Sequence, residues 1–261
     1  MLARVPDILS RIVADKVAAL PQLRAQLETL EWQAGERRAS RRDFRAALVG
    51  SQPAIIAEIK QASPSKGVLT ENFEPARIAR AYADGGAAAL SVLTDEKYFH
   101  GSLDHLESAR DAVSIPVLRK DFTVDDAQVV EAAARGADAV LLIAAVLKEA
   151  SLRRLRELAA SYGMAALVEV HDEQELAPAL NSGAGIVGVN NRNLHTFEVT
   201  LETSLRLAEQ IPAGVVKVSE SGIRSSADVK RLTGAGYQAF LVGEHLMKAG
   251  DPAGALRDLR S

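Results

Sequence analysis

Eight short apolar segments recur between residues 54 and 244, and this repeat constrains the fold more than any other feature of the sequence. Segments with the pattern of amphipathic helices separate them, at intervals of roughly 20 to 35 residues. Strands that alternate with helices are typical of β-α-β units, which build a parallel sheet with right-handed crossovers. The apolar segments are AIIAEIK (54–60), AAALSVL (87–93), PVLRKDF (116–122), DAVLLIA (138–144), MAALVEV (164–170), GIVGVN (185–190), VVKVSES (215–221) and QAFLVGE (238–244).

Eight such units fit a (β/α)8 barrel, and this α/β architecture is the fold that we predict. A doubly wound Rossmann sheet is the alternative. That sheet needs G-x-G-x-x-G after its first strand, whereas the corresponding turn here reads QASPSKGVL, with one glycine. Gly86, Gly136 and Gly236 follow expected helices, where a left-handed C-cap suits them. We predict a single barrel domain over residues 1–261.

The first 50 residues precede the repeat. Their pattern predicts one long amphipathic helix at about 6–33 and a short polar helix between Glu36 and Phe44. We expect residues 1–50 to form a helical extension that packs on the barrel and caps it, in preference to a separate binding module. The basic cluster of this extension is typical of a solvated helix face, and it comprises Arg37, Arg38, Arg41 and Arg42.

Composition argues against several classes of function. The chain of 261 residues carries 31 Lys and Arg against 34 Asp and Glu, so it has no basic footprint for nucleic acid. The absence of cysteine excludes disulfides, thiolate metal sites and a cysteine nucleophile. No apolar run reaches the roughly 18 residues of a membrane span, and the N-terminus lacks the apolar core of a signal peptide. We therefore expect a cytoplasmic protein that binds neither nucleic acid nor membrane, and the histidines lack the spacing of metal ligands.

Charged and amide side chains end five of the predicted strands. The carboxyl ends of barrel strands meet at one rim, where barrel enzymes have their active sites. Buried charges of both signs are costly for a purely structural network, so an active site is the favoured interpretation. His171 shares a strand face with Glu169, and we expect it to form hydrogen bonds in the loop. The strand-end residues are Glu58, Lys60, Lys120, Glu169, Asn190, Arg192 and Glu220.

Two glycine-containing turns follow the last two predicted strands. Loops at these places in a barrel often bind phosphate through backbone N–H groups, and glycine allows a close approach. We expect Ser221, Gly222 and Gly243 to hold a phosphate, with only the backbone of Glu244 contributing; the alternative is that both glycines serve tight turns. The segment 63–67 is either a lid that brings Ser63 and Lys66 toward the ligand or a simple turn.

As a set, these motifs resemble the indole-3-glycerol phosphate synthase family, and the resemblance covers essentially the whole chain. It implies a tryptophan-pathway enzyme without cofactor or metal. The substrate of that family, 1-(2-carboxyphenylamino)-1-deoxyribulose 5-phosphate, closes a ring, loses CO2 and then loses water. The resemblance rests on IIAEIKQASPSKG (55–67), LSVLTDEKYFHGS (90–102), PVLRKDF (116–122), LVEVHDEQEL (167–176), GVNNRNLHTFEV (188–199), VSESGI (218–223) and FLVGEHLM (240–247).

The resemblance also implies roles for individual residues. Lys120 would be the general acid of ring closure and Glu169 the acid/base of dehydration, with Glu58 and Lys60 close by. How the dehydration protons are divided among these four residues stays open. By the same resemblance, Asn190, Arg192 and Ser221 would orient the ribulose hydroxyls, and Ser221, Gly222 and Gly243 would hold the phosphate. Glu220 would position cationic groups, and Ser63 would face one end of the substrate.

Two alternatives remain at this point. One is another phosphate-binding barrel enzyme, either a phosphoribosyl-anthranilate isomerase or an aldolase with a lysine Schiff base. The isomerase would not need charged groups on five strands, and the aldolase would need a desolvated, neutral lysine. The other alternative is a barrel retained as a scaffold, which loss of Lys120 or Glu169 would have marked. Association with other tryptophan-pathway enzymes is left open.

Overall fold

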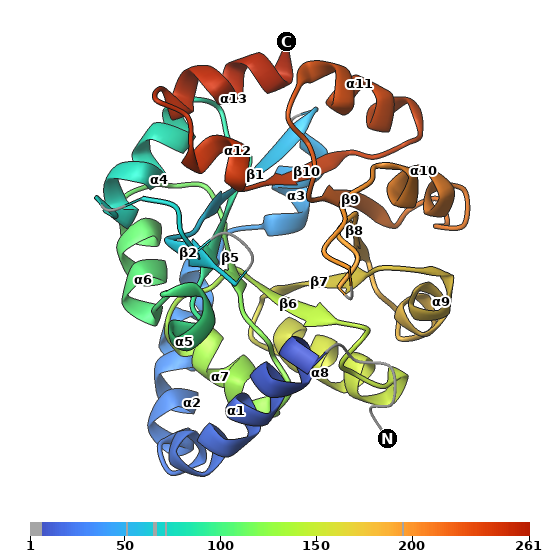
Figure 1. Cartoon of the computed structure of the whole chain (residues 1–261). Coiled ribbons are helices and arrows are strands. Elements are labelled where there is room, and N and C mark those ends of the chain that lie inside the picture. Colours follow the sequence, from blue (N-terminus) through green and yellow to red (C-terminus); the bar gives the residue numbers. More distant parts are fainter. Residues whose placement is uncertain (1–6, 51, 65–66, 71, 195) are drawn as a thin grey trace.

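The computed structural model describes residues 7–50, 52–64, 67–70, 72–194 and 196–261. Eight parallel strands close into a barrel, and each predicted apolar segment supplies one of them (Figure 1). Helices alternate with these strands around the outside, which confirms the predicted (β/α)8 barrel. The barrel strands are β1 (Ala54–Ile59), β4 (Ala89–Leu93), β5 (Val117–Lys120), β6 (Ala139–Ile143), β7 (Ala165–Val170), β8 (Ile186–Asn190), β9 (Val216–Glu220) and β10 (Ala239–Val242).

The helices that surround the barrel begin and end with recognisable signals. Asp125 and Ser225 form capping boxes at the starts of two of them. Gly86 and Gly136 adopt positive φ values of 87° and 90° after two helix ends, as predicted. The helices are α4 (Pro75–Asp84), α5 (Glu96–Phe99), α6 (Leu103–Asp111), α7 (Asp126–Ala134), α8 (Glu149–Ser161), α9 (Glu173–Asn181), α10 (Glu202–Ala208), α11 (Ser226–Gly234), α12 (Glu244–Met247) and α13 (Pro252–Arg260).

Alternation along the strands divides the apolar side chains between two cores. On β1, Ile55 and Ala57 pack outward in the core shared with the helices, whereas Ala54 and Ile56 fill the barrel interior. The barrel is therefore packed with side chains over much of its length. Among the helices of the described residues, none is long and apolar enough to cross a membrane.

The prediction of one continuous helix at about 6–33 is wrong, because two helices occupy this segment. α1 (Asp7–Arg24) and α2 (Leu27–Glu36) are separated by a turn in which the N–H of Gln26 donates to the carbonyl oxygen of Leu23 (3.0 Å). The break allows the two helices to bury their apolar faces against different surfaces. α1 lies across the C-terminal rim of the barrel, and α2 packs against α7 at the side (Figure 1).

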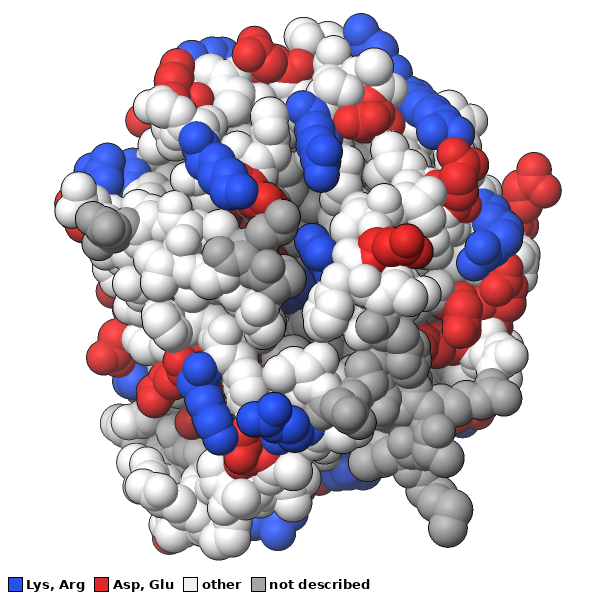
Figure 2. Space-filling model, viewed as in Figure 1, with Lys and Arg blue, Asp and Glu red and all other residues white. Residues whose placement is uncertain are grey.

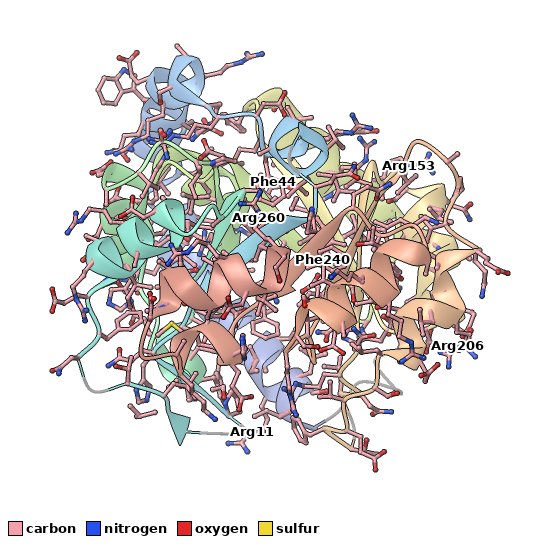
Figure 3. All side chains as sticks on the ribbon, turned by 90° about the horizontal axis from the view of Figure 1, so that it is seen from above. Arg11, Phe44, Arg153, Arg206, Phe240 and Arg260 are labelled. Atoms are coloured by element: carbon pink, nitrogen blue, oxygen red, sulfur yellow. The ribbon has the colours of Figure 1, made fainter. Side chains whose placement is uncertain are left out.

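The predicted polar helix between Glu36 and Phe44 is also wrong. A 3₁₀ turn, η1 (Arg37–Ser40), occupies part of this segment, and α3 (Phe44–Gly50) begins where the prediction ends. Phe44 and Leu48 of α3 are fully buried and close the end of the barrel opposite α1, as Figure 3 shows for Phe44. The helix that begins at the apolar Phe44 therefore covers the end of the barrel where the strands begin.

Two arginines of the basic cluster do not lie on a solvated helix face. Arg42 donates hydrogen bonds to the carbonyl oxygens of Arg110 (3.1 Å) and Ile115 (2.8 Å), and Arg41 donates one to that of Tyr162 (3.3 Å). These carbonyls lie at or just beyond the ends of α6 and α8, where a helix leaves acceptors without partners and attracts cations. The extension thus caps neighbouring helices as well as the barrel.

Candidate active site

The C-terminal rim of the barrel surrounds a cavity of about 670 Å³. Figure 2 shows a hollow near the middle of this face, with atoms of Lys or Arg visible inside it. The structure brings the whole predicted set of site residues together around this one cavity. They are Glu58, Lys60, Ser63, Lys120, Glu169, Asn190, Arg192, Glu220, Ser221, Gly222, Gly243 and Glu244.

Strand alternation explains why the charged side chains converge. On β1, Ile56 points into the barrel interior, and Glu58 is the next residue on that face. Lys120 follows the inward-facing Leu118 on β5 in the same way, and Glu169 occupies the equivalent place on β7. The charged groups are therefore the uppermost layer of side chains inside the barrel, directly above its apolar filling.

Lys120 lies at the centre of the charged layer. Its Nζ is 3.4 Å from Glu169 Oε2 and 3.4 Å from Glu220 Oε2. Burial alone would lower the pKa of Lys120, but the carboxylates of Glu169, Glu220 and Glu58 outweigh it and hold that pKa well above its ordinary value. Lys120 is therefore an ammonium cation at neutral pH.

The three buried carboxyl groups differ in acidity. Burial would raise the pKa of Glu58, but Lys60, its ion-pair partner, and Lys120 lower it below the ordinary value. Burial acts likewise on Glu169, where Lys120 and His171 hold the pKa well below its usual range. For Glu220, burial prevails over Lys120 and the pKa rises to about 8. Environments that separate the pKa values of neighbouring groups are typical of acid–base sites.

Two glycines make room for these carboxylates. A Cβ on Gly243 would collide with Glu58 Oε1, and one on Gly188 would collide with Glu220 Oε1. Sequence reasoning assigned Gly243 to a phosphate contact, with a tight turn as the alternative. The structure adds a second reason for glycine at this strand end, because any side chain would displace a carboxylate of the charged layer.

Asn190 joins the ends of β8 and β9. Its Oδ1 accepts hydrogen bonds from the backbone N–H of Arg192 (3.0 Å) and from the hydroxyl of Ser221 (2.9 Å). Ser221 and Gly222 both have positive φ, 68° and 83°, which turns the chain sharply after β9. The Arg192 guanidinium donates to the carbonyl oxygen of Phe197 (3.3 Å) and so holds the loop that follows β8.

The remaining predicted residues lie around the cavity mouth. The Glu244 carboxylate forms an ion pair with Lys248 (2.7 Å), one helical turn further along the chain. Ser63 belongs to a small two-stranded antiparallel sheet of β2 (Ala62–Ser63) and β3 (Gly67–Val68). Sequence reasoning offered either a lid or a simple turn for this segment. Lys66 is outside the described residues.

Sequence reasoning missed the apolar half of the cavity wall. Ile8, Leu9 and Ile12 of α1 line the cavity, and Phe99 and Phe122 pack with ring centroids 6.1 Å apart in the same wall. The available signal was the apolar face of the first helix, which the prediction used for packing only. A wall of this kind suits a flat aromatic group of a ligand, opposite a charged floor.

Comparison with known proteins identifies the family of this chain. The model for the family described as indole-3-glycerol phosphate synthase matches residues 9–259. This chain belongs to the indole-3-glycerol phosphate synthase family. A protein of that name from Burkholderia vietnamiensis is 52% identical over 257 residues, covering 96% of this chain and 97% of the relative. Another, from Polaromonas naphthalenivorans, is 51% identical over 259 residues, covering 97% and 98%.

Membership in the indole-3-glycerol phosphate synthase family makes the chain an enzyme, a carboxy-lyase of tryptophan biosynthesis. Solved structures with lower identity share the barrel. A thiamine phosphate pyrophosphorylase from Pyrococcus furiosus has a TM-score of 0.59 at 19% identity and covers 79% of this chain and 93% of its own. A structure titled KGPDC, from Streptococcus mutans, has a TM-score of 0.61 at 14% identity, covering 80% and 96%. At such identities the likeness shows the fold alone.

The described residues contain no group of three or more His, Asp or Glu side chains placed to hold a metal ion. The charged layer consists instead of alternating ammonium and carboxylate groups.

Proposed function

We propose that the rim cavity binds 1-(2-carboxyphenylamino)-1-deoxyribulose 5-phosphate and converts it to indole-3-glycerol phosphate, CO2 and water. The observation that carries this proposal is the position of Lys120, between the buried carboxyl groups of Glu169 and Glu220 on the floor of a cavity whose opposite wall is apolar. The floor suits the ketone and hydroxyl groups of the substrate. The apolar wall suits its aromatic ring.

Ring closure needs a proton donor at the ketone oxygen. The ring carbon that bears the carboxylate forms a bond to the ketone carbon, and the C=O electrons move to the oxygen, which takes a proton. We assign this proton to Lys120, because an incipient alkoxide is a stronger base than a lysine amine even when the lysine pKa is raised. The bond to the carboxylate then breaks, CO2 leaves, and its electrons restore the aromatic ring.

Dehydration needs an acid and a base. The hydroxyl on the former ketone carbon leaves as water after protonation, and the neighbouring carbon loses a proton to form the indole double bond. We assign the acid/base role to Glu169, whose ionised carboxylate accepts a proton and exchanges it with the adjoining Lys120 (3.4 Å). The Glu58–Lys60 ion pair adjoins the same space.

The remaining contacts would hold the substrate. Asn190, Ser221 and Arg192 form a polar wall suited to the ribulose hydroxyls. The turns at Ser221, Gly222 and Gly243 are proposed to bind the phosphate, with Glu244 contributing its backbone. Glu220 is assigned to positioning Lys120, from which it lies 3.4 Å.

Fluorescence of indole-3-glycerol phosphate tests the proposed function. Purified protein and the anilino-ribulose substrate, without added metal or cofactor, are expected to yield the fluorescent product, and Glu169→Gln is expected to abolish it. Glu173→Gln is the matched control, because this exposed glutamate of α9 is paired with Arg206 (2.7 Å) outside the cavity. Product formation by Glu169→Gln at the rate of the control would contradict the role of Glu169.

Inorganic phosphate is expected to raise the melting temperature of the protein. A ligand that binds only the folded state adds about 2.7 kcal/mol at 100-fold over its Kd. The measurement is a thermal melt at fixed ionic strength, with chloride replacing phosphate in the control. Ser221→Ala is expected to reduce the shift. An equal shift from both salts would show that phosphate has no specific site at the turns after β9 and β10.

We further propose that the enzyme works in the cytoplasm. Support comes from its place in a biosynthetic family and from the charge of its proposed phosphorylated substrate, which does not cross membranes unaided. Fractionation of cells tests the location. Co-purification at physiological salt tests whether other tryptophan-pathway enzymes associate with it.

A further inference from the structure

His171 lies behind the charged floor, between two carboxylates. It follows the last residue of β7, and its side chain is about nine-tenths buried. Its Nδ1 is 2.9 Å from Glu175 Oε2, and its Nε2 is 3.3 Å from Glu169 Oε1. Glu169 lines the cavity, whereas His171 is set back from it. The imidazole thus contacts a reacting group of the proposed mechanism from the side away from the substrate.

The two oxygens of Glu169 have different partners. Oε1 faces His171, and Oε2 faces Lys120 at 3.4 Å. A carboxylate held by one cation on each oxygen has its plane fixed, so Oε2 stays directed at the lysine and the cavity. A single contact would leave the carboxylate free to rotate about its last side-chain bond.

Glu175 fixes the protonation state of His171. Its Oε2 accepts from both Nδ1 and the backbone N–H of His171, each at 2.9 Å, and it sits in the first turn of α9, which Asp172 caps. Nδ1 must therefore carry a proton. A neutral ring would then present the lone pair of Nε2 to Glu169 Oε1 at 3.3 Å, which is repulsive, whereas an imidazolium forms ion pairs with both carboxylates.

We propose that His171 is a positioning residue that stays protonated and keeps Glu169 ionised and correctly oriented. This inference rests on the acid/base role proposed for Glu169. It makes Glu175, His171, Glu169 and Lys120 one chain of alternating charges that runs from helix α9 to the cavity floor.

The electrostatics of the chain agree with the geometry. Burial would lower the pKa of His171, but Glu169 from β7 and Glu175 from α9 face it and raise that pKa to about 10. Lys120, from β5, acts on the same Glu169 carboxylate. Because the folded pKa is raised, the imidazolium is fully present at neutral pH and is lost only as the pH rises through about 10.

Replacement by neutral amides tests the charge. His171→Gln keeps a donor near the Nε2 position without the charge, and His171→Asn keeps one near Nδ1. We expect kcat to fall by about 10- to 100-fold, the size typical of partners that orient a reacting group. KM should change by less than about 3-fold, because His171 lies outside the cavity lining. The acidic limb of the kcat profile should move up by about 1 to 3 pH units, since Glu169 loses one neighbouring cation.

Glu175→Gln tests the same chain from its far end. Removal of that carboxylate lowers the pKa of His171. We therefore expect kcat at pH 6 to be close to that of the parent enzyme. At alkaline pH, kcat should begin to fall at a pH well below the one at which the parent enzyme loses activity. Glu173→Gln on the same helix is the control and should leave the profile unchanged.

The outcomes separate this inference from the proposed function. If Glu169→Gln retains activity, the role of Glu169 is wrong. If Glu169→Gln is inactive while His171→Gln keeps the parental kcat and pH profile, the positioning role of His171 is wrong. Should both His171 variants fail to fold, Glu175→Gln decides: a new alkaline limb supports the inference, and an unchanged profile overturns it.

Discussion

Lys120→Met is expected to lower kcat by about 100- to 10,000-fold, the usual cost of removing a positioned acid. Methionine preserves the length of the side chain but supplies neither charge nor proton. KM should change only a few-fold, because the apolar wall and the turns proposed for phosphate stay in place. Single-turnover and steady-state kinetics, with a melting curve to confirm folding, measure the effect.

Lys120→Arg is the companion variant, and it should recover the charge but little activity. Arginine is a poor proton donor because its pKa lies far above that of an ordinary lysine and its planar head has a fixed geometry. The ionised carboxylate of Glu169, 3.4 Å from Nζ, also keeps Lys120 charged, whereas a Schiff base needs the neutral amine. A substrate adduct on Lys120 after borohydride reduction, detected by mass spectrometry, would transfer the enzyme to the aldolase-like class.

Lys16→Met is expected to lower the free energy of unfolding by about 3 kcal/mol. Nζ of Lys16, on α1, lies 2.8 Å from Asp95 and 2.6 Å from Asp121, and both carboxylates are almost fully buried. Removing one partner of a buried ion pair typically costs 3–5 kcal/mol, roughly, and the lower end applies because Asp121 keeps Arg119 at 3.2 Å. Urea unfolding at equilibrium measures the change.

Asp15→Asn is the matched control for Lys16→Met. Asp15 is the preceding residue of α1, and its ion pair with Lys97 (2.7 Å) is exposed to solvent, so its loss should lower the free energy of unfolding far less than the loss of Lys16. KM should rise in Lys16→Met but hardly in Asp15→Asn, because loosening α1 displaces part of the apolar cavity wall. Equal stability of the two variants would show that Lys16 does not clamp α1 to the rim.

Strand positions and their inward faces could be predicted from the sequence, because both depend on local alternation. Glu58 shares a face with Ile56, and Lys120 with Leu118, whatever the rest of the chain does. Convergence at one rim then follows from closing parallel strands into a barrel. This is why all the predicted strand-end residues line one cavity.

The features that the sequence did not predict depend on packing between segments that lie far apart in the sequence. Apolar periodicity over 6–33 marks a buried face, but it does not tell that α1 covers the rim while α2 covers the side. Nothing in the basic cluster distinguishes Arg42, which caps helix ends, from a solvated residue. The shared face of His171 and Glu169 indicated neighbours, but the turn of the imidazole toward α9 depends on where Glu175 lies.

The two kinds of cavity wall give this enzyme separable routes of evolutionary change. At the strand ends next to Glu58 and Glu220, a side chain at position 243 or 188 would displace a carboxyl group of the charged layer, so substitutions there disturb the reacting floor. The opposite wall is carried by α1 and by loops, where apolar side chains exchange at small cost if volume is kept. Selection for ring-substituted substrates is therefore free to remodel the helix that precedes the barrel while the reacting groups remain in place.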